Sequence, residues 1–270
     1  MFRYLFKIQF LKSFFYNNLI FKSQNTNHKW LTDKSFFKTL GKIIRVNDLQ
    51  KKHQFYFEEL INNESLEKYW NSKINKHKIF HNKVNEDNRN FKSILLDFLK
   101  YRVFFCYTLV RLIKPKNILE TGVAAGVSSS LILAALKKNN CGKLISIDLP
   151  PSLGMKEYKT LDKNVGILVP ENFKQYWTFK KGDSKKLLGQ LLLKNNPEIF
   201  IHDSLHEYKH MLFEYVNSWM IMKKKSFILT DDLMLGVKGN KKAWFDFLKL
   251  SDLKGLSFIK NENFGLTIIK

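Results

Sequence analysis

The densest group of titratable side chains follows a short apolar run, in the segment FIHDSLHEY at residues 200–208. A strand of a parallel sheet is covered on both faces, so its sequence stays apolar until the chain leaves the core. Residues 199–201 fit such a strand, which puts Asp203 at its carboxyl end and His206 just beyond. Because ligands of open α/β sheets bind at that end of the strands, we expect Asp203 and His206 to be catalytic residues.

The imidazole of His206 is suited to accept a proton near neutral pH, because its ordinary pKa is about 6.5. We therefore expect His206 to act as the general base. His202 is the weaker candidate because strand alternation directs it away from Asp203. His210 lies one helical turn beyond His206, where we expect a packed or solvated residue. The alternative for His206 is structural, with its ring bound to a loop carbonyl.

Two further carboxylates end the next predicted strand, in the segment SFILTDD at residues 226–232. If the two strands are neighbours, Asp203, Asp231 and Asp232 lie at strand ends about 5 Å apart. Carboxylates so close together resist ionising unless a cation lies among them. Mg²⁺ prefers such oxygen ligands, so the sequence predicts a magnesium site made by these three residues. The alternative is that one aspartate caps the next helix and another binds loop amides.

A glycine-containing loop, ETGVAAGVSSS at residues 120–130, joins a predicted strand to a helix. Glycine lets the backbone approach a ligand closely, and the helix amino terminus presents free N–H groups. Gly122 and Gly126 are separated by three residues, which disfavours the G-x-G-x-x-G loop of nicotinamide enzymes. Glu120 before the loop and Asp148 at the end of the next strand favour a cofactor with a positive group and a ribose diol. The alternative is a tight turn with a helix-capping acid.

The elements that must position these side chains alternate regularly after residue 91. Apolar spacing predicts a long helix ended by Pro115, after which strands and helices follow one another. Such alternation implies right-handed crossovers and a parallel sheet. The final segments LSFIK and FGLTIIK are separated only by NEN, which favours an antiparallel hairpin. The earlier strands are predicted at residues 117–121, 143–150, 176–184 including the exit turn, 198–203 and 226–232.

Residues 1–90 show helical spacing interrupted by polar stretches, and they predict a basic helical cap without strands before a main domain at residues 91–270. Residues 1–22 are apolar and basic, and their Lys and Arg residues interrupt any membrane span. We expect an amphipathic helix packed on the body there. The alternative is peripheral membrane contact through that helix.

The net charge of +22, from 46 Lys and Arg against 24 Asp and Glu, suggests nucleic acid as a partner. The excess is spread along the chain, so we do not expect a dedicated nucleic-acid surface. Cys106 and Cys141 form no metal or redox spacing. We expect both to be packing residues in a reducing cytoplasm, and the sequence leaves the formation of a homo-oligomer open.

The chain from about residue 95 to residue 270 resembles the class I S-adenosylmethionine-dependent methyltransferases, in the group that contains small-molecule and glycan O-methyltransferases. The segments ILETGVAAGVSSS, ISIDLP, GDS, FIHDSLHEY and ILTDD carry the resemblance. The resemblance implies an α/β fold with a Rossmann-like, doubly wound, mostly parallel sheet of seven strands, the last antiparallel. The N-terminal helical cap would be added to that fold.

The resemblance also implies roles for single residues. Gly122 and Gly126 would approach the methionine part of S-adenosylmethionine, and Asp148 would bind its ribose. Asp183 in the GDS turn would lie near the adenine. Ser128 would contact the methionine carboxylate through the helix end, or would only cap the helix.

The expected function is S-adenosylmethionine-dependent O-methylation of a hydroxyl on a small molecule or glycan, by in-line attack and with Mg²⁺ assistance. The three aspartates resemble the metal site of catechol-type and macrolide-sugar O-methyltransferases, although the catechol enzymes have an amide where Asp232 stands. One alternative is an RNA methyltransferase, which the charge favours but for which no N-P-P-Y-like segment is present. The other is a non-catalytic basic binding protein on the same fold.

Overall fold

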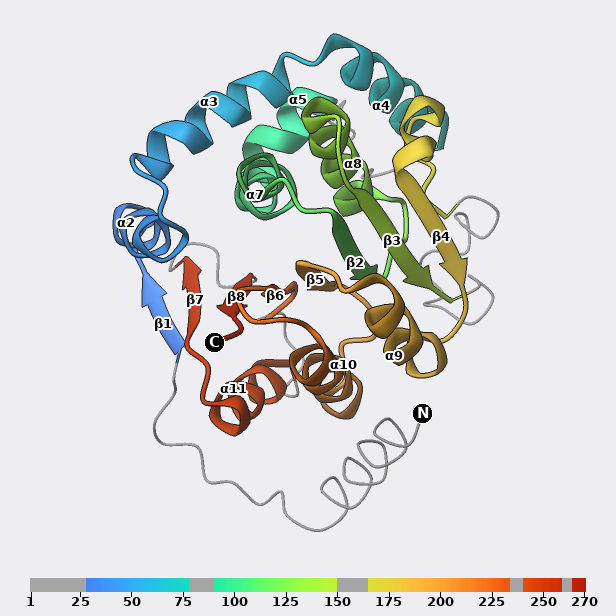
Figure 1. Ribbon diagram of the computed structural model, residues 1–270. Helices are drawn as coiled ribbons and strands as arrows, with labels where there is room; N and C mark the ends of the chain where they lie inside the picture. The colour runs from blue at the N-terminus through green and yellow to red at the C-terminus, as the bar shows by residue number, and fades with distance from the viewer. Residues whose placement is uncertain (1–27, 78–89, 150–164, 234–239, 259–263) are drawn as a thin grey trace, which may run out of the picture.

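The computed structural model describes residues 28–77, 90–149, 165–233, 240–258 and 264–270. An eight-stranded sheet lies at its centre, in the order β1-β7-β8-β6-β5-β2-β3-β4 (Figure 1). β8 is antiparallel to β6 and β7, and the other neighbours are parallel. The strands are β1 (His28–Leu31), β2 (Asn117–Thr121), β3 (Lys143–Asp148), β4 (Trp177–Lys181), β5 (Ile199–His202), β6 (Phe227–Thr230), β7 (Gly255–Phe258) and β8 (Gly265–Ile268).

The strands β2 to β8 confirm the predicted α/β sheet, including its antiparallel last strand. The absence of a strand from residues 1–90 was a wrong expectation, because β1 pairs in parallel with β7 at the edge of the sheet. β1 is only four residues long, too short for alternation to appear in the sequence. Its hydrogen-bonding partner lies near the opposite end of the chain, so no local pattern indicates the pairing.

Helices cover both faces of the sheet, as expected of a doubly wound fold. On one face, apolar side chains of α9 (Ser184–Asn195), α10 (Tyr208–Ile221) and α11 (Asn240–Ser251) pack against strand residues such as Leu119 and Phe200. On the other face, α8 (Val127–Asn139) joins the predicted long helix in a larger core. The two helix layers fix the strand ends, where the polar side chains lie.

The predicted long helix before β2 is present but is not regular. It consists of α5 (Phe91–Ser93), the π-helical η1 (Ile94–Phe98), α6 (Lys100–Val103), the π-helical η2 (Phe104–Thr108) and α7 (Leu109–Ile113). π-Helical turns inside α-helices are rare and occur often at functional sites. The short α6 between the two π-turns carries Arg102, which reaches the strand ends described below.

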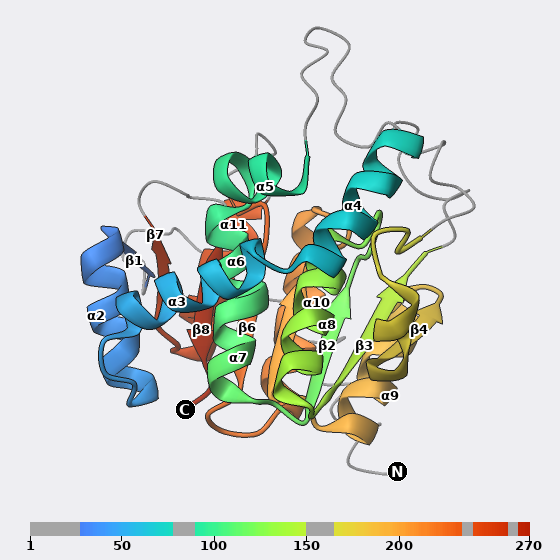
Figure 2. The same ribbon diagram turned by 90° about the horizontal axis from the view of Figure 1, so that it is seen from above.

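Of the N-terminal helices, α2 (Asp33–Ile44) lies beside β1 and β7, and α3 (Leu49–Ile61) and α4 (Glu64–His77) cross the outside of α6, α7 and α8 (Figure 2). They contribute fully buried side chains to the same core as the sheet. Phe36 stacks on Phe258 of β7 with ring centroids 3.8 Å apart, and Trp70 donates to Ser130 of α8 at 3.0 Å. A domain boundary at residue 90 stays a prediction, and the predicted amphipathic helix at residues 1–22 lies outside the described residues.

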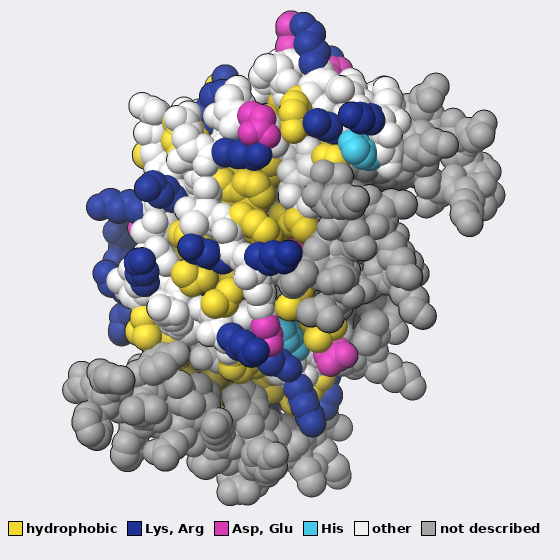
Figure 3. All heavy atoms as spheres, turned by 90° about the vertical axis from the view of Figure 1, so that its right-hand side faces the viewer, with side chains coloured by type: hydrophobic (Ala, Val, Ile, Leu, Met, Phe, Trp, Pro, Cys, Tyr) yellow, Lys and Arg dark blue, Asp and Glu magenta, His cyan; other side chains and the backbone are white. Residues whose placement is uncertain are grey.

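The face of the molecule that includes the β4 edge shows Lys and Arg side chains dispersed among polar and apolar ones (Figure 3). This dispersion agrees with the spread of charge along the sequence. Cys106 is buried and Cys141 is partly buried, and neither forms a disulfide. None of the helices in the described ranges combines the length and apolar character needed to cross a membrane.

Candidate active site

The loop after β2 passes close to the end of β5. Gly122 has a φ of +85°, and a Cβ atom on it would lie 1.8 Å from the carbonyl oxygen of Asp203. A side chain at this position would therefore collide with backbone that cannot move freely. Gly126, with a φ of +87°, precedes α8 as its N-cap residue. The loop thus brings the amino terminus of α8 to the carboxyl ends of the parallel strands.

The carboxylate of Asp148, at the end of β3, holds the same loop. Its Oδ2 accepts hydrogen bonds from the amides of Val123 at 2.8 Å and Ala124 at 2.9 Å, and its Oδ1 accepts from Leu149. Asp183 caps α9 by accepting from the amide of Lys185. β2, β3 and β4 are adjacent and parallel. The predicted cofactor residues Gly122, Asp148 and Asp183 therefore all lie at the carboxyl ends of these strands.

Glu120 lies on β2 but points into the interior. It is fully buried, and its Oε2 accepts from the hydroxyls of Ser129 at 2.6 Å and Ser146 at 2.8 Å. Burial raises the pKa of Glu120 to about 7. Its Oε1 has no hydrogen-bond partner. The structure thus places Glu120 beneath the cofactor loop, and its predicted role in cofactor binding stays a prediction.

Two of the three aspartates at the ends of β5 and β6, Asp203 and Asp231, bind the same side chain, which the sequence analysis missed. Arg102 of α6 donates through Nη1 to Asp203 at 3.1 Å and to Ser128 at 2.6 Å. Its Nη2 donates to Asp231. β5 and β6 are neighbours as expected. The guanidinium of Arg102 thus supplies a positive charge beside two of these carboxylates.

The local sequence signal for Arg102 is a single charge in the otherwise apolar and aromatic segment YRVFFC at residues 101–106. Lys and Arg are rarely buried unless they are paired, so an arginine inside a predicted core helix indicates a buried acidic partner. The identity of that partner does not follow from the pattern, since Asp203 and Arg102 are 101 positions apart in the sequence.

The carboxylates remain crowded despite Arg102. Burial, together with the charge of Asp231, raises the pKa of Asp203 well above its usual range, while Arg102 acts in the opposite direction. Burial and Asp231 also raise the pKa of Asp232 to about 6. One guanidinium does not offset three carboxylates. The site therefore favours a further positive charge.

His206 lies within this cluster. One ligand atom from each of Asp203, His206 and Asp232 falls within 4.8 Å of the others. The Nε2 atom of His206 is 3.8 Å from Oδ2 of Asp232 and makes no hydrogen bond within the part of the chain that the structure describes. Burial lowers the pKa of His206 to about 3. The imidazole is therefore neutral at neutral pH, with its lone pair available.

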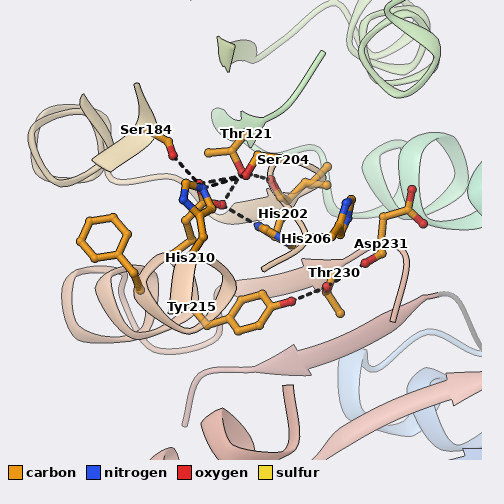
Figure 4. A network of polar contacts seen from close by, with 12 residues as sticks. Thr121, Ser184, His202, Ser204, His206, His210, Tyr215, Thr230 and Asp231 are labelled. Atoms are coloured by element: carbon orange, nitrogen blue, oxygen red, sulfur yellow. Dashed lines mark hydrogen bonds and ion pairs between the residues drawn. The ribbon is translucent and has the colours of Figure 1, made fainter. Parts of the chain in front are cut away.

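His202 and His210 belong to a separate buried network around Glu214 of α10 (Figure 4). Glu214 accepts from His202 at 2.6 Å and from Thr121 at 2.6 Å, and it contacts Nε2 of His210 at 2.8 Å. Burial opposes ionisation of Glu214, but the two histidines lower its pKa below its ordinary value. The network joins α10 to the ends of β2 and β5. The sequence analysis missed Glu214, which resembles an ordinary helix-surface charge.

Comparison with known proteins gives a family model that matches part of the chain and a similar fold. The model of a family described as a methyltransferase domain matches residues 119–233. A structure assigned as an O-methyltransferase of Klebsiella pneumoniae superposes with a TM-score of 0.52 at 13% identity, over 80% of this chain and 95% of that one. The O-methyltransferase TomG of Streptomyces achromogenes, in complex with S-adenosylmethionine, gives 0.49 at 14% identity over 77% and 91%. No curated protein matches the sequence.

The likeness to the Klebsiella structure concerns the fold, and the family match covers the glycine loop, Asp148, Asp183 and the strand-end aspartates. These are the segments on which the resemblance in the sequence depended. Residues 119–233 are therefore similar to a methyltransferase domain, and the chain has the fold of the Klebsiella structure.

Proposed function

We propose that the protein methylates a hydroxyl oxygen of a small-molecule or glycan acceptor, with the help of a divalent cation. The observation that carries the proposal is the position of the Asp203–His206–Asp232 cluster beside the cofactor loop. Gly122 packs against the carbonyl of Asp203, and Ser128 lies 3.5 Å from its carboxylate. An oxygen that loses its proton in this cluster would lie next to the loop that positions the methyl donor.

The residues around the loop fit S-adenosylmethionine. The amino terminus of α8 has no side-chain cap and no acidic residue in its first turn, so its N–H groups suit the methionine carboxylate. Ser128 lies in that turn. Asp148 is partly exposed, and carboxylate oxygens accept more than one hydrogen bond, so it serves the loop amides and a ribose diol together. Asp183 would lie on the adenine side.

When bound, the cofactor supplies a methyl group on a positively charged sulfur, and the reaction then needs a nucleophilic oxygen in line with it. Asp203, Asp231 and Asp232 supply the negative charge that favours a divalent cation, which the sequence predicts to be Mg²⁺. A cation held there lowers the pKa of a coordinated hydroxyl. His206 is the neutral nitrogen base of the cluster and lies at the same place.

The proposal is tested with purified full-length protein and radiolabelled S-adenosylmethionine, incubated with fractionated cell extract. We expect label in hydroxylated small molecules or glycans, and we expect chelation to abolish transfer while leaving cofactor binding largely intact. Label that enters RNA would support an RNA methyltransferase instead. Cofactor binding without transfer to any fraction would support a non-catalytic binding protein.

The cellular setting is part of the same proposal. Cys106 and Cys141 are both free thiols, which agrees with a reducing cytoplasm. Peripheral membrane contact through residues 1–22 and assembly into a homo-oligomer stay predictions. Vesicle flotation and light scattering of the full-length protein would test them.

A further inference from the structure

Arg102 binds two of the three aspartates, and the two differ in burial. Its Nη2 donates to Asp231, whose side chain is only 2% exposed, and its Nη1 donates to Asp203, whose side chain is 22% exposed. The side chain of Asp232 is 28% exposed. Asp231 is thus the most enclosed of the three, and among the described residues it does not belong to the group of ligand atoms that lie within 4.8 Å of one another. Asp203 and Asp232 do belong to that group, so they are the aspartates placed to face a bound ion.

His206 replaces Asp231 in the remaining group. One of its ring nitrogens lies within 4.8 Å of carboxylate oxygens of both Asp203 and Asp232, and its Nε2 is 3.8 Å from Oδ2 of Asp232. Nε2 is buried and has no hydrogen-bond partner among the described residues, although a buried polar atom without a partner costs free energy. A cation between the three side chains would pair with the nitrogen and with both carboxylates.

The charges also balance in this arrangement. A divalent cation offsets Asp203 and Asp232, and Arg102 offsets Asp231. The imidazole of His206 would add a ligand without adding charge, because an imidazole nitrogen binds a cation through the lone pair of its neutral form. Three protein ligands leave coordination positions for an acceptor oxygen and for water.

We propose that Asp203, His206 and Asp232 form the cation site, and that His206 binds the ion through Nε2. This inference rests on the proposed cation-assisted function and specifies its ligands. Oxygen ligands and water suit Mg²⁺, whereas an imidazole nitrogen suits the later first-row transition ions. The site therefore takes a divalent transition ion in preference to Mg²⁺. The assignment replaces the general-base role of His206, because a nitrogen whose lone pair binds a cation accepts no proton.

The test uses full-length protein freed of metal and titrated with Co²⁺ or with Mg²⁺. We expect Co²⁺ to bind at least about tenfold more tightly than Mg²⁺, in keeping with the affinity of nitrogen donors. Bound Co²⁺ should give a strongly shifted, exchangeable imidazole proton in the NMR spectrum. That signal should be lost in His206→Gln. It should persist in His53→Gln, a matched control whose histidine bonds to Thr108 on η2.

A second variant tests metal selection by restoring an all-oxygen site. His206→Asp should still bind a divalent ion but should shift the preference toward Mg²⁺. Equal affinity of the wild-type protein for Mg²⁺ and Co²⁺, or an imidazole signal that survives in His206→Gln, would overturn the inference. Binding of S-adenosylmethionine is measured in the same samples by calorimetry. Wild-type protein that binds neither cofactor nor ion speaks against the proposed function, whereas normal cofactor binding with the wrong metal pattern speaks only against this site.

Discussion

The polar groups at the carboxyl ends of β2 and β3 and those at the ends of β5 and β6 are stabilised in different ways. At the ends of β2 and β3, backbone amides satisfy a carboxylate, as Asp148 accepts from Val123 and Ala124. At the ends of β5 and β6, side-chain charges satisfy one another, as Arg102 binds Asp203 and Asp231. The first half depends on local loop geometry, and the second depends on one arginine from a distant helix. Substitutions in the two halves should therefore differ in the size of their effect. They should also differ in the property affected, which is stability or cofactor affinity.

Replacing Arg102 should have the largest effect on stability. Arg102→Met leaves Asp203 and Asp231 in the interior without their counter-ion, and breaking a buried pair costs about 3–5 kcal/mol. Chemical denaturation of the variant and the wild type measures the loss. Arg111→Met is the matched control, since Arg111 lies on α7 and pairs with a single carboxylate, Glu59. Equal losses in the two variants would contradict the special role of Arg102.

Adding Asp231→Asn to Arg102→Met tests whether the loss of stability comes from uncompensated charge or from lost packing. If the cost arises from uncompensated charge, the second substitution should recover part of the lost stability. Purely additive losses would indicate that Arg102 acts through packing, for instance against the ring of Phe264, from whose centroid its guanidinium is 5.2 Å. The double-mutant cycle separates the two causes.

Gly122→Val should weaken cofactor binding at the ends of β2 and β3. The added Cβ would meet the Asp203 carbonyl at 1.8 Å at a positive φ, and such strain costs on the order of 3 kcal/mol. We expect cofactor affinity to fall by about a hundredfold, as measured by calorimetry. Circular dichroism serves as the control for folding. Wild-type affinity in a folded variant would show that the loop does not shape the cofactor site.

Asp148→Ala should have the next largest effect. The variant loses the carboxylate that we expect at the ribose, so binding of S-adenosylmethionine should weaken by about 1.5–3 kcal/mol for each charged hydrogen bond lost. Asp252→Ala is a suitable control, because its exposed carboxylate lies on the loop before β7. Unchanged affinity in Asp148→Ala would remove Asp148 from the cofactor site.

Glu120→Gln should have the smallest effect, and one that depends on pH. The folded state raises the pKa of Glu120 from 4.5 to about 7, so the folded protein holds this proton more tightly than the unfolded chain does. Its contribution to stability is complete below pH 4.5 and is lost as the pH rises through 7. The loss is on the order of 3 kcal/mol. In Glu120→Gln this part of the pH dependence of unfolding should disappear, whereas in Glu198→Gln, a partly exposed strand-start residue, it should persist.

The sequence could predict what local patterns determine. Apolar runs with turn signals located β2 to β8, and adjacency of β5 and β6 gathered Asp203, Asp231 and Asp232. It could not predict contacts between distant segments. Arg102 meets Asp203 across 101 positions, and β1 pairs with β7 across most of the chain. Glu214 escaped notice because a glutamate within a helix normally faces water, and only the histidines beside it explain its burial.

The pairing of β1 with β7 has a consequence for the order in which the sheet is completed during synthesis. His28 is made 227 residues before its partner Gly255. The edge of β7 stays without its outer neighbour until β1 reaches it. Contacts between such distant residues form slowly, because a long loop must close before they are made. β1 therefore completes its side of the sheet only after β2 to β7 have been synthesised.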